Sequence, residues 1–371
     1  MIRSLFWPLA AFSLASPFFA GAAPTELINV TLFTPPSDYT DPRVLYARTV
    51  QLPNNDLLAT WENYSPEPPP VGATWAEIAR VQDAALGVGL RYQPQLYVLP
   101  EAVGGFAAGT LLLAGSAIPT DLSSTMLELY ASTDSGLTWE FVSHVAAGGR
   151  AVPDNGLTPV WEPFLLAREG RLIYYYSDQR ENATYGQKLV HQTSADLRVW
   201  DDGNAPLVDD VAYPTYTDRP GMPTVALLPN GQYIYVYEYG GGPNPATTDG
   251  SYSFPVFYRM SADPEAFMQA EHHPLVTTGG DVPTGSPYVV WTPAGGEDGT
   301  IIVSSGCCSE VYMNRALGAE DAWEKVATPA GSSYTRSLMV FQEDPSYVLI
   351  AGAGKLPPST TNSVQISVIK V

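Results

Sequence analysis

The sequence predicts an all-β fold, a six-bladed β-propeller. A unit of strand, turn and strand recurs six times along the 371 residues. Most copies are followed by a third strand and by a polar turn that ends on an aromatic residue and leads into a fourth strand. Four antiparallel strands per repeat are the content of a propeller blade. Helical periodicity is nearly absent, and the single short candidate helix is Trp75–Leu86.

The six hairpin copies each contain two apolar strands around a short turn. They are Val50–Thr60, Leu96–Ala114, Phe164–Tyr176, Thr224–Tyr237, Tyr288–Ser304 and Leu338–Ala351. Asn230-Gly231 is the strongest turn signal, because Asn-Gly favours two-residue hairpin loops. A β-sandwich also consists of short strands and turns, but the regular copies favour the propeller. We expect the strand at Asn29–Phe33 to pair with Val364–Ile369 and close the ring.

The N-terminal segment has the layout of a secretory signal peptide. Arg3 gives a positive start, an apolar run spans 5–19, and Ala20-Gly21-Ala22 offers a small-residue cleavage site. The run is too short to cross a membrane. We therefore expect a signal peptide at 1–22, a single propeller domain at 23–371, and a secreted, extracellular monomer.

Composition narrows the class of partner. Lys and Arg number 18 against 38 Asp and Glu, a formal charge of −20. Nucleic acids and anionic membrane surfaces require basic patches, so neither is expected as a partner. A neutral polysaccharide or oligosaccharide is compatible with this charge. Asn29, Asn63 and Asn182 begin Asn-x-Ser/Thr sequons, which predict a glycoprotein if the host glycosylates.

One turn carries a specific motif. Ser132–Trp139 reads S-x-D-x-G-x-T-W, the Asp box. We expect Asp134 to bind backbone N–H groups of its own turn, Gly136 to take an unusual φ, and Trp139 to plug into the blade. A degraded copy lies at 72–75. The motif is structural, and no catalytic role is assigned to it.

The beginnings of the inner strands lie on one face of a propeller and surround its hub. Three of them place a polar residue directly before Pro: Gln93, Glu162 and Ser286. Pro favours extended backbone at the preceding residue, which we expect to aim these side chains into the hub. The other candidate substrate-binding residues of this face are Trp161, Arg48, Arg219, Tyr288 and Arg336.

The ends of the second strands return to the same face and carry Glu62, Asp178 and Glu238. Glu162 and Glu238, from consecutive blades, are expected to converge above the channel. Two carboxylates in an aromatic cleft are what glycosidic bond cleavage requires. A single Glu at a strand end is more often a solvated surface residue, and Glu62 is a rival in a nearly equal context.

The same face leaves further alternatives open. For Asp178, the alternatives are binding of sugar hydroxyls and an ion pair with Arg180. For Arg48, Arg219 and Arg336, they are binding of substrate and pairing with a nearby Asp. Cys307-Cys308 is expected to be oxidised in a secreted protein, as a platform for substrate near the hub or as a turn staple. Only four His are present, and none has ligand spacing with this pair. No metal and no cofactor are expected.

These residues resemble two related groups of proteins. The Asp box resembles the sialidase superfamily. The segments similar to glycoside hydrolase family 93 are 160–164, 174–178, 187–191, 219–223 and 237–239. This resemblance implies a sialidase-like six-bladed propeller and exo-action on α-1,5-linked L-arabinan, releasing arabinobiose with retention. It also implies Glu162 as nucleophile and Glu238 as general acid/base.

Two other functions stay open at this point. One is a sialidase-like hydrolase, with Arg48, Arg219 and Arg336 as a carboxylate-binding triad. The stretch Tyr46–Val50 departs from the sialidase motif of the first blade. The other is a non-catalytic carbohydrate-binding propeller. Exo-action needs one blocked end of the cleft, and the insertion at 65–86 is the expected block.

Overall fold

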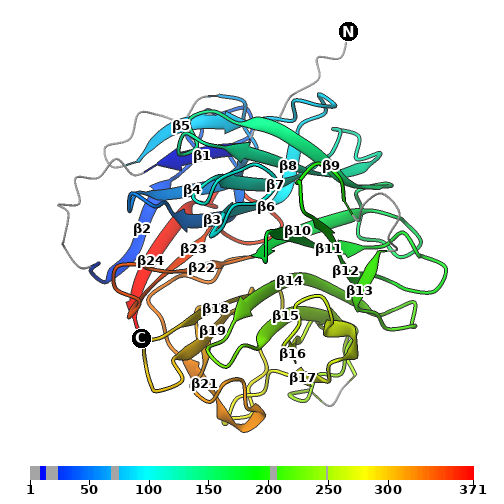
Figure 1. The fold of residues 1–371 in the computed structure, drawn as a ribbon, viewed down its shortest axis with the longest axis vertical. Helices are drawn as coiled ribbons and strands as arrows, with labels where there is room; N and C mark the ends of the chain where they lie inside the picture. The colour runs from blue at the N-terminus through cyan, green and yellow to red at the C-terminus, as the bar shows by residue number, and fades with distance from the viewer. Residues whose placement is uncertain (1–8, 14–23, 68–74, 201–206, 248–249) are drawn as a thin grey trace.

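The computed structural model describes residues 24–67, 75–200, 207–247 and 250–371, and the backbone of residues 9–13. The strands of these residues form six four-stranded antiparallel sheets arranged around a common centre (Figure 1). The inner strand of each sheet contacts the inner strands of its two neighbours, and the sixth contacts the first, which closes the ring. The protein is an all-β propeller.

Four of the sheets use consecutive strands. The second sheet contains β6 (Leu90–Val98), β7 (Leu111–Ala117), β8 (Thr125–Ser132) and β9 (Glu140–Gly148). The third contains β10 (Val160–Arg168), β11 (Arg171–Asp178), β12 (Lys188–Ser194) and β13 (Val208–Val211). The fourth contains β14 (Arg219–Leu227), β15 (Tyr233–Gly240), β16 (Val256–Ser261) and β17 (His272–Pro274). The fifth contains β18 (Tyr288–Thr292), β19 (Thr300–Ser304), β20 (Val311–Asn314) and β21 (Trp323–Val326).

The sixth sheet joins the two ends of the domain. It contains β22 (Ser337–Val340), β23 (Tyr347–Gly352), β24 (Val364–Lys370) and β2 (Leu27–Phe33). β2 pairs antiparallel with β24, with Val30 opposite Ile366 and Phe33 opposite Val364, and the two strands lie side by side in Figure 1. The expected closure of the ring by the first and last strands is therefore confirmed.

The first sheet differs from the prediction. It contains β3 (Val44–Gln51), β4 (Leu57–Asn63), β1 (Leu9–Ser13) and β5 (Ala76–Val81), in that order. β1 comes from the predicted signal peptide and pairs with both β4 and β5. Removal of residues 1–22 would therefore take away the strand that joins β5 to this sheet. The predicted cleavage site and part of the degraded Asp box, 72–74, lie outside the described residues.

The candidate helix Trp75–Leu86 is wrong. Its first half is the strand β5, which takes extended pairing with β1. Its second half is a turn around Asp83, whose carboxylate accepts hydrogen bonds from the N–H groups of Ala85, Leu86 and Val88. An Asp that binds the N–H groups just after it competes with helix formation. Among the described residues, the helical segments are the two short 3₁₀ turns η2 (Phe267–Gln269) and η3 (Glu320–Ala322).

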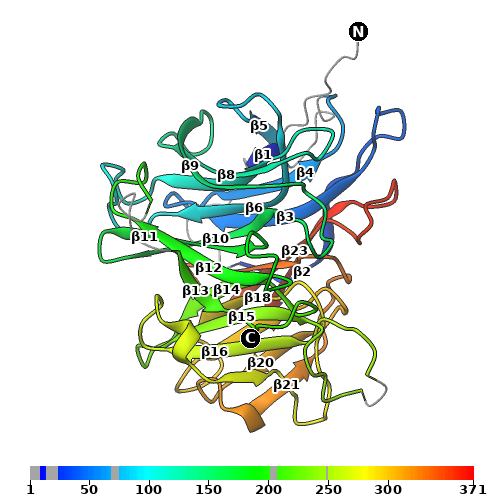
Figure 2. The ribbon, with the colours of Figure 1, turned by 90° about the vertical axis from the view of Figure 1, so that its right-hand side faces the viewer.

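The apolar core is divided between the sheets rather than gathered at one centre. Six large clusters of buried side chains each lie between two neighbouring sheets. Figure 2 shows the strands of these sheets from the side. In the described part of the chain, no helix has the length and hydropathy of a membrane span. Because each sheet packs through its faces, the strand ends at the hub are left available for a site.

The Asp box has the expected geometry. Asp134 accepts hydrogen bonds from the N–H and the hydroxyl of Thr138 and from the hydroxyl of Ser132. Gly136 has φ +89°, and Trp139 donates to the Gly136 carbonyl. Its ring packs against the cluster between the first and second sheets. The motif therefore fastens the turn between β8 and β9, away from the hub.

Candidate functional site

Each inner strand begins with a left-handed residue. The non-glycine residues with positive φ at these six equivalent places are Tyr46, Gln93, Glu162, Met222, Ser286 and Thr335. In the first four sheets, the pairing between the first two strands shifts register at this point. A bulge of this kind turns a side chain out of the ladder. The expectation of extended backbone before Pro is thus wrong at Gln93, Glu162 and Ser286, all of which are left-handed. At Gln93 and Glu162 the bulge overrides the local preference.

Glu162 and Glu238 meet at the mouth of the hub. Glu162 follows Trp161 on β10, and Glu238 lies near the end of β15. A Cβ atom on Gly221 would be 3.2 Å from Glu162 Oε2 and 3.2 Å from Glu238 Oε1. These two oxygens are therefore separated by at most twice that distance. Carboxyl groups are about 5–5.5 Å apart in retaining glycosidases and about 6.5–9.5 Å apart in inverting ones.

The two carboxylates have unequal surroundings. Glu162 Oε2 accepts hydrogen bonds from the hydroxyl of Ser177 and from the N–H of Met222, the latter at 2.8 Å. Glu238 Oε2 accepts one from the N–H of Ser286 at 2.6 Å. Hydrogen bonds to an ionised carboxylate stabilise it. Glu162 is therefore better prepared than Glu238 to carry a negative charge.

Burial raises the pKa of both groups. For Glu162, the hydrogen bonds from Ser177 and Met222 and the charge of Arg219 oppose this effect. For Glu238, the negative charge of Glu162 adds to burial, and the pKa rises to about 8. A neutral Glu238 beside an ionised Glu162 is the arrangement that separates an acid from a nucleophile.

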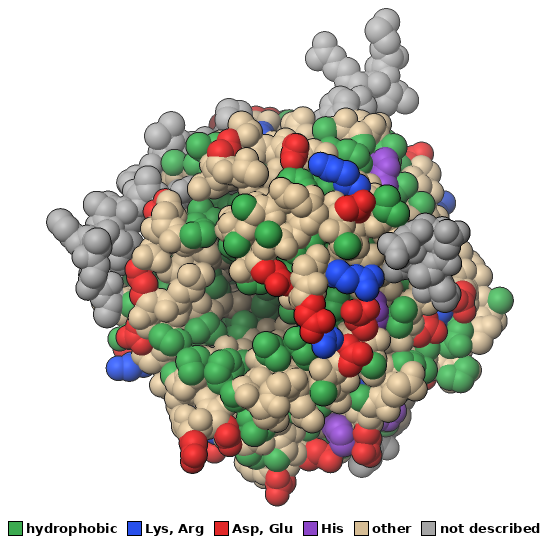
Figure 3. All heavy atoms as spheres, viewed as in Figure 1, with side chains coloured by type: hydrophobic (Ala, Val, Ile, Leu, Met, Phe, Trp, Pro, Cys, Tyr) green, Lys and Arg blue, Asp and Glu red, His purple; other side chains and the backbone are tan. Residues whose placement is uncertain are grey.

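A cavity of about 720 Å³ opens around this pair. The predicted residues Gln93, Trp161 and Arg219 line it together with the two glutamates. Aromatic and apolar side chains complete much of the wall: Tyr46, Tyr64, Tyr92, Tyr252, Phe254, Tyr334, Leu356 and Pro358. Figure 3 shows a hollow near the middle of the face seen in Figure 1. Aromatic walls with a few polar groups suit the binding of sugar rings.

Gln187 organises one side of the cavity and was missed in the sequence. Its Oε1 accepts hydrogen bonds from Trp161 Nε1 at 3.0 Å and from Arg219 at 3.2 Å. Its Nε2 donates to the carbonyl of Pro220 at 2.7 Å. The residue thereby fixes both the indole and the guanidinium beside the carboxylates. It precedes a third strand, β12, and only the similarity of segment 187–191 to the family marked it.

Two other predicted binding residues lie below the carboxylates. Arg48 and Tyr288 border a small space of about 20 Å³ and not the large cavity. The Arg48 guanidinium lies 5.6 Å from the Tyr288 ring centre and donates to the carbonyls of Ala47 and Thr335. Tyr288 accepts a hydrogen bond from Gln95. Glu162 borders the same small space, so both residues lie next to the pair without lining the large cavity.

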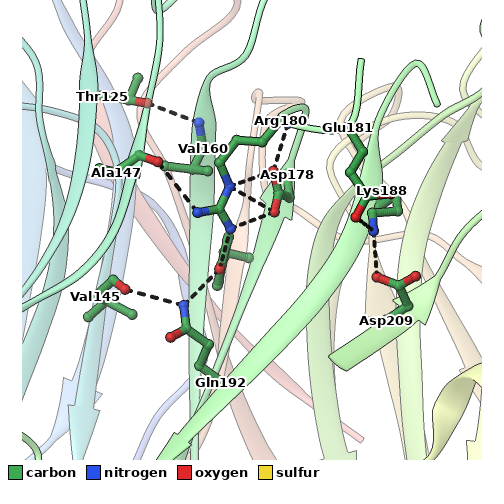
Figure 4. A network of polar contacts seen from close by, with 11 residues as sticks. Thr125, Val145, Ala147, Val160, Asp178, Arg180, Glu181, Lys188, Gln192 and Asp209 are labelled. Atoms are coloured by element: carbon green, nitrogen blue, oxygen red, sulfur yellow. Dashed lines mark hydrogen bonds and ion pairs between the residues drawn. The ribbon is translucent and has the colours of Figure 1, made fainter. Parts of the chain in front are cut away.

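Asp178 and Arg336 are engaged by the protein itself. Asp178 forms an ion pair with Arg180, whose guanidinium nitrogens lie 2.7–3.1 Å from the carboxylate oxygens (Figure 4). Arg336 is 1% exposed and donates to the backbone carbonyls of Ser305, Ser309 and Glu310. Arg48, Arg219 and Arg336 thus point to separate partners and do not converge on one point.

Glu62, the rival carboxylate, is buried at 2% exposure and does not line the cavity. Burial raises its pKa to about 7, while hydrogen bonds from the hydroxyl of Tyr64 and the N–H of Tyr92 oppose this effect. The sulfur atoms of Cys307 and Cys308 form a disulfide, which also lies outside the cavity lining. The described residues of the insertion at 65–86 contribute nothing to that lining either. Among the described residues, no three metal-binding side chains come together.

Neither a protein-family model nor a curated protein matches the chain. Solved structures do. An α-L-arabinofuranosidase of glycoside hydrolase family 93 from Fusarium graminearum, solved with arabinobiose, is 56% identical, with a TM-score of 0.87 over 93% of this chain and 98% of that one. An α-L-arabinanase from Penicillium chrysogenum, also solved with arabinobiose, is 59% identical, with a TM-score of 0.86 over 94% and 99%.

A sialidase from Streptococcus pneumoniae is 10% identical, with a TM-score of 0.61 over 96% of this chain and 72% of that one. At this identity the likeness concerns the fold alone. The identities of 56% and 59% over nearly the whole chain are high enough to show the family. They agree with the paired carboxylates at the hub, and the chain belongs to glycoside hydrolase family 93.

Proposed function

We propose that this glycoside hydrolase is a secreted, retaining enzyme that acts from the chain end on α-1,5-linked L-arabinan and releases arabinobiose. The observation that carries the proposal is the pairing of Glu162 and Glu238 inside an aromatic cavity. The two relatives solved with arabinobiose support the choice of sugar.

The retaining mechanism is supported by the short distance between the two carboxylates. One oxygen of each carboxylate lies 3.2 Å from the Cβ position of Gly221, so the two groups approach each other there, as direct attack by a retaining enzyme requires; inverting enzymes need additional room for a water molecule. In the first step, Glu162 attacks the anomeric carbon as the glycosidic bond breaks, and Glu238 gives its proton to the leaving oxygen. In the second step, Glu238 takes a proton from water, and the resulting hydroxide displaces Glu162.

The surroundings of the pair support this division of roles. Glu162 accepts two hydrogen bonds that favour its charged form, as a nucleophile requires. Glu238 has a pKa of about 8, which keeps its proton available at neutral pH. Arg219 and Trp161, both held by Gln187, line the cavity beside the two glutamates, where the reacting sugar would bind.

We also propose that the secreted domain is a six-bladed monomer. Five sheets consist of strands beyond residue 22, and six left-handed inner-strand residues mark six repeats. Cleavage of the predicted signal peptide would leave the first blade without β1. N-terminal sequencing of the secreted protein tests the cleavage, and light scattering tests the monomer.

Product analysis tests the activity. The purified protein is incubated with linear arabinan, branched arabinan and sialosides, and NMR follows the anomer that is released first. We expect arabinobiose from linear arabinan with the configuration kept. Release of sialic acid, or no product from any of the three, would contradict the proposal. The Glu162→Gln and Glu238→Gln variants should both lose activity on linear arabinan.

A further inference from the structure

We propose that the loop Ser305–Glu310, closed by the Cys307–Cys308 disulfide, is a positioning element for the catalytic acid Glu238 and acts through Ser286. The inference rests on the proposed function, since it assigns Glu238 the role of acid. It concerns a part of the molecule beside the cavity, since neither cysteine is among the residues that line it.

The first step is the dependence of Glu238 on a single backbone donor. Among the described residues, the N–H of Ser286 is the one hydrogen-bond donor to its carboxylate, at 2.6 Å. The charged and titratable groups that face Glu238 from the surrounding elements are Glu162, Arg219, Tyr252 and Tyr334. None of them replaces this hydrogen bond. A small displacement of Ser286 therefore changes both the place of the carboxyl group and its tendency to hold a proton.

The second step is the backbone conformation of that donor. Gly285 and Ser286 are consecutive left-handed residues, with φ of +75° and +44°. A non-glycine residue in this region is strained and persists only where the surroundings hold it. The segment just before β18 must therefore be fixed from outside.

The third step identifies what fixes it. On one side, the N–H of Gly285 donates to the carbonyl of Phe254 at 2.9 Å. On the other, the N–H of Gly306 donates to the carbonyl of Gly285 at 2.7 Å, and that of Cys307 donates to the carbonyl of Thr284 at 3.1 Å. Two successive N–H groups of the disulfide loop thus hold the two residues that precede Ser286.

The fourth step explains why the loop can do this. A disulfide between adjacent residues closes a small ring and limits the rotation of the backbone within it. The buried Arg336 guanidinium binds the carbonyls of Ser305, Ser309 and Glu310 from the opposite side. Tyr312 directs its hydroxyl to Cys308 Sγ at 3.8 Å. The loop is therefore a rigid connection between Arg336 and the residues Thr284 and Gly285, which precede the hydrogen-bond donor to Glu238.

The experiment replaces both cysteines by serine and compares two substrates. An arabino-oligosaccharide needs full protonation of its leaving oxygen, whereas a dinitrophenyl arabinobioside hardly needs it. In the double variant, we expect kcat/KM, which reports the first bond cleavage, to fall about tenfold for the oligosaccharide and to change less than twofold for the dinitrophenyl substrate. An Arg315→Ala variant, which loses an exposed ion pair with Glu324 of the same sheet, should match the wild type on both.

A second readout is independent of activity. The pKa of the Glu238 carboxyl is followed by carbon-13 NMR, with Glu238→Gln to assign the signal. Because the Ser286 N–H lowers this pKa, we expect a higher value in the double serine variant, and an alkaline limb of kcat/KM displaced in the same direction. An unchanged pKa, or equal losses on both substrates with a lower Tm, would show a staple without a positioning role. If the wild type cleaves neither substrate, the proposed function fails while the NMR comparison still decides this inference.

Discussion

Gly221 is the residue at which a single methyl group tests the geometry of the proposed catalytic pair, Glu162 and Glu238. An added Cβ would lie 3.2 Å from an oxygen of each glutamate and 3.1 Å from Gln187 Nε2. Contacts this short oblige the neighbours to move by a few tenths of an ångström. A misplacement of about 1 Å at a reacting centre costs on the order of 100-fold. We therefore expect Gly221→Ala to lower kcat about tenfold, which corresponds to about 1.4 kcal/mol in the activation barrier.

The assay is the initial rate of arabinobiose release from linear arabinan. Gly296→Ala is the matched control, because Gly296 lies in the turn between β18 and β19 and the nearest atom to its added Cβ is 3.9 Å away. We expect this control to match the wild type, and both variants to keep a wild-type Tm within a few degrees. If Gly221→Ala keeps kcat within twofold of the wild type, the two carboxylates are not as close around Gly221 as described, and the argument for retention loses its basis.

Three further outcomes follow from the site. In Glu238→Gln, kcat/KM for a dinitrophenyl arabinobioside should be largely kept, because the first bond cleavage then needs no acid, while kcat falls because the base of the second step is lost, and activity on arabinan is lost. Glu162→Gln should lose kcat/KM for both substrates; the opposite pattern would reverse the roles, and equal behaviour of the two variants would refute them. The raised pKa of Glu238 means that the folded protein holds this proton more tightly than the unfolded chain, so stability falls as pH rises from about 4.5 to about 8. Calorimetry should accordingly show Glu238→Gln with a higher Tm than the wild type at pH 8 and an equal Tm near pH 4. Gln187→Ala should lower kcat/KM about tenfold by releasing Trp161 and Arg219, and normal kinetics would remove Gln187 from the site.

Most of the fold could be predicted from the sequence because strand and turn signals are local. Alternating apolar residues around Asn230-Gly231 predict a hairpin without knowledge of anything distant. The Asp box at Ser132–Trp139 is a self-contained set of hydrogen bonds, so its residues predict its geometry. The pairing of β1 with β4 and β5 is different in kind. It joins residues between 45 and 72 positions apart, and nothing in Leu9–Ser13 itself indicates those partners.

The sequence predicts which residues lie at the hub, because the order of the strands determines their positions. It does not predict which hydrogen-bond partner each of these side chains has. The pair Glu162 and Glu238 follows from strand ends that must meet at one face of a propeller. Arg48 and Arg336 lie on that face, yet both donate hydrogen bonds to backbone carbonyls. The sequence alone does not distinguish an arginine that binds substrate from one that binds backbone carbonyls. Likewise, the carboxylate of Asp178 faces Arg180, two residues away, and the sequence left that pairing open.

The six left-handed residues explain why a few side chains are enough to give this fold a candidate active site. The propeller repeats the same strained inner-strand geometry six times and fills it with side chains as different as Tyr46, Met222 and Glu162. Strain at these places does not itself create a site, since five of the six residues are not carboxylates. A site arises in the third and fourth sheets because the strained position holds a glutamate and the neighbouring second strand ends on Glu238. Glu62 lies near the end of the second strand of the first sheet in the same way, but the left-handed residue of that sheet is Tyr46, and Glu62 does not line the cavity. The chemistry is therefore fixed by the coincidence of two residues in adjacent repeats.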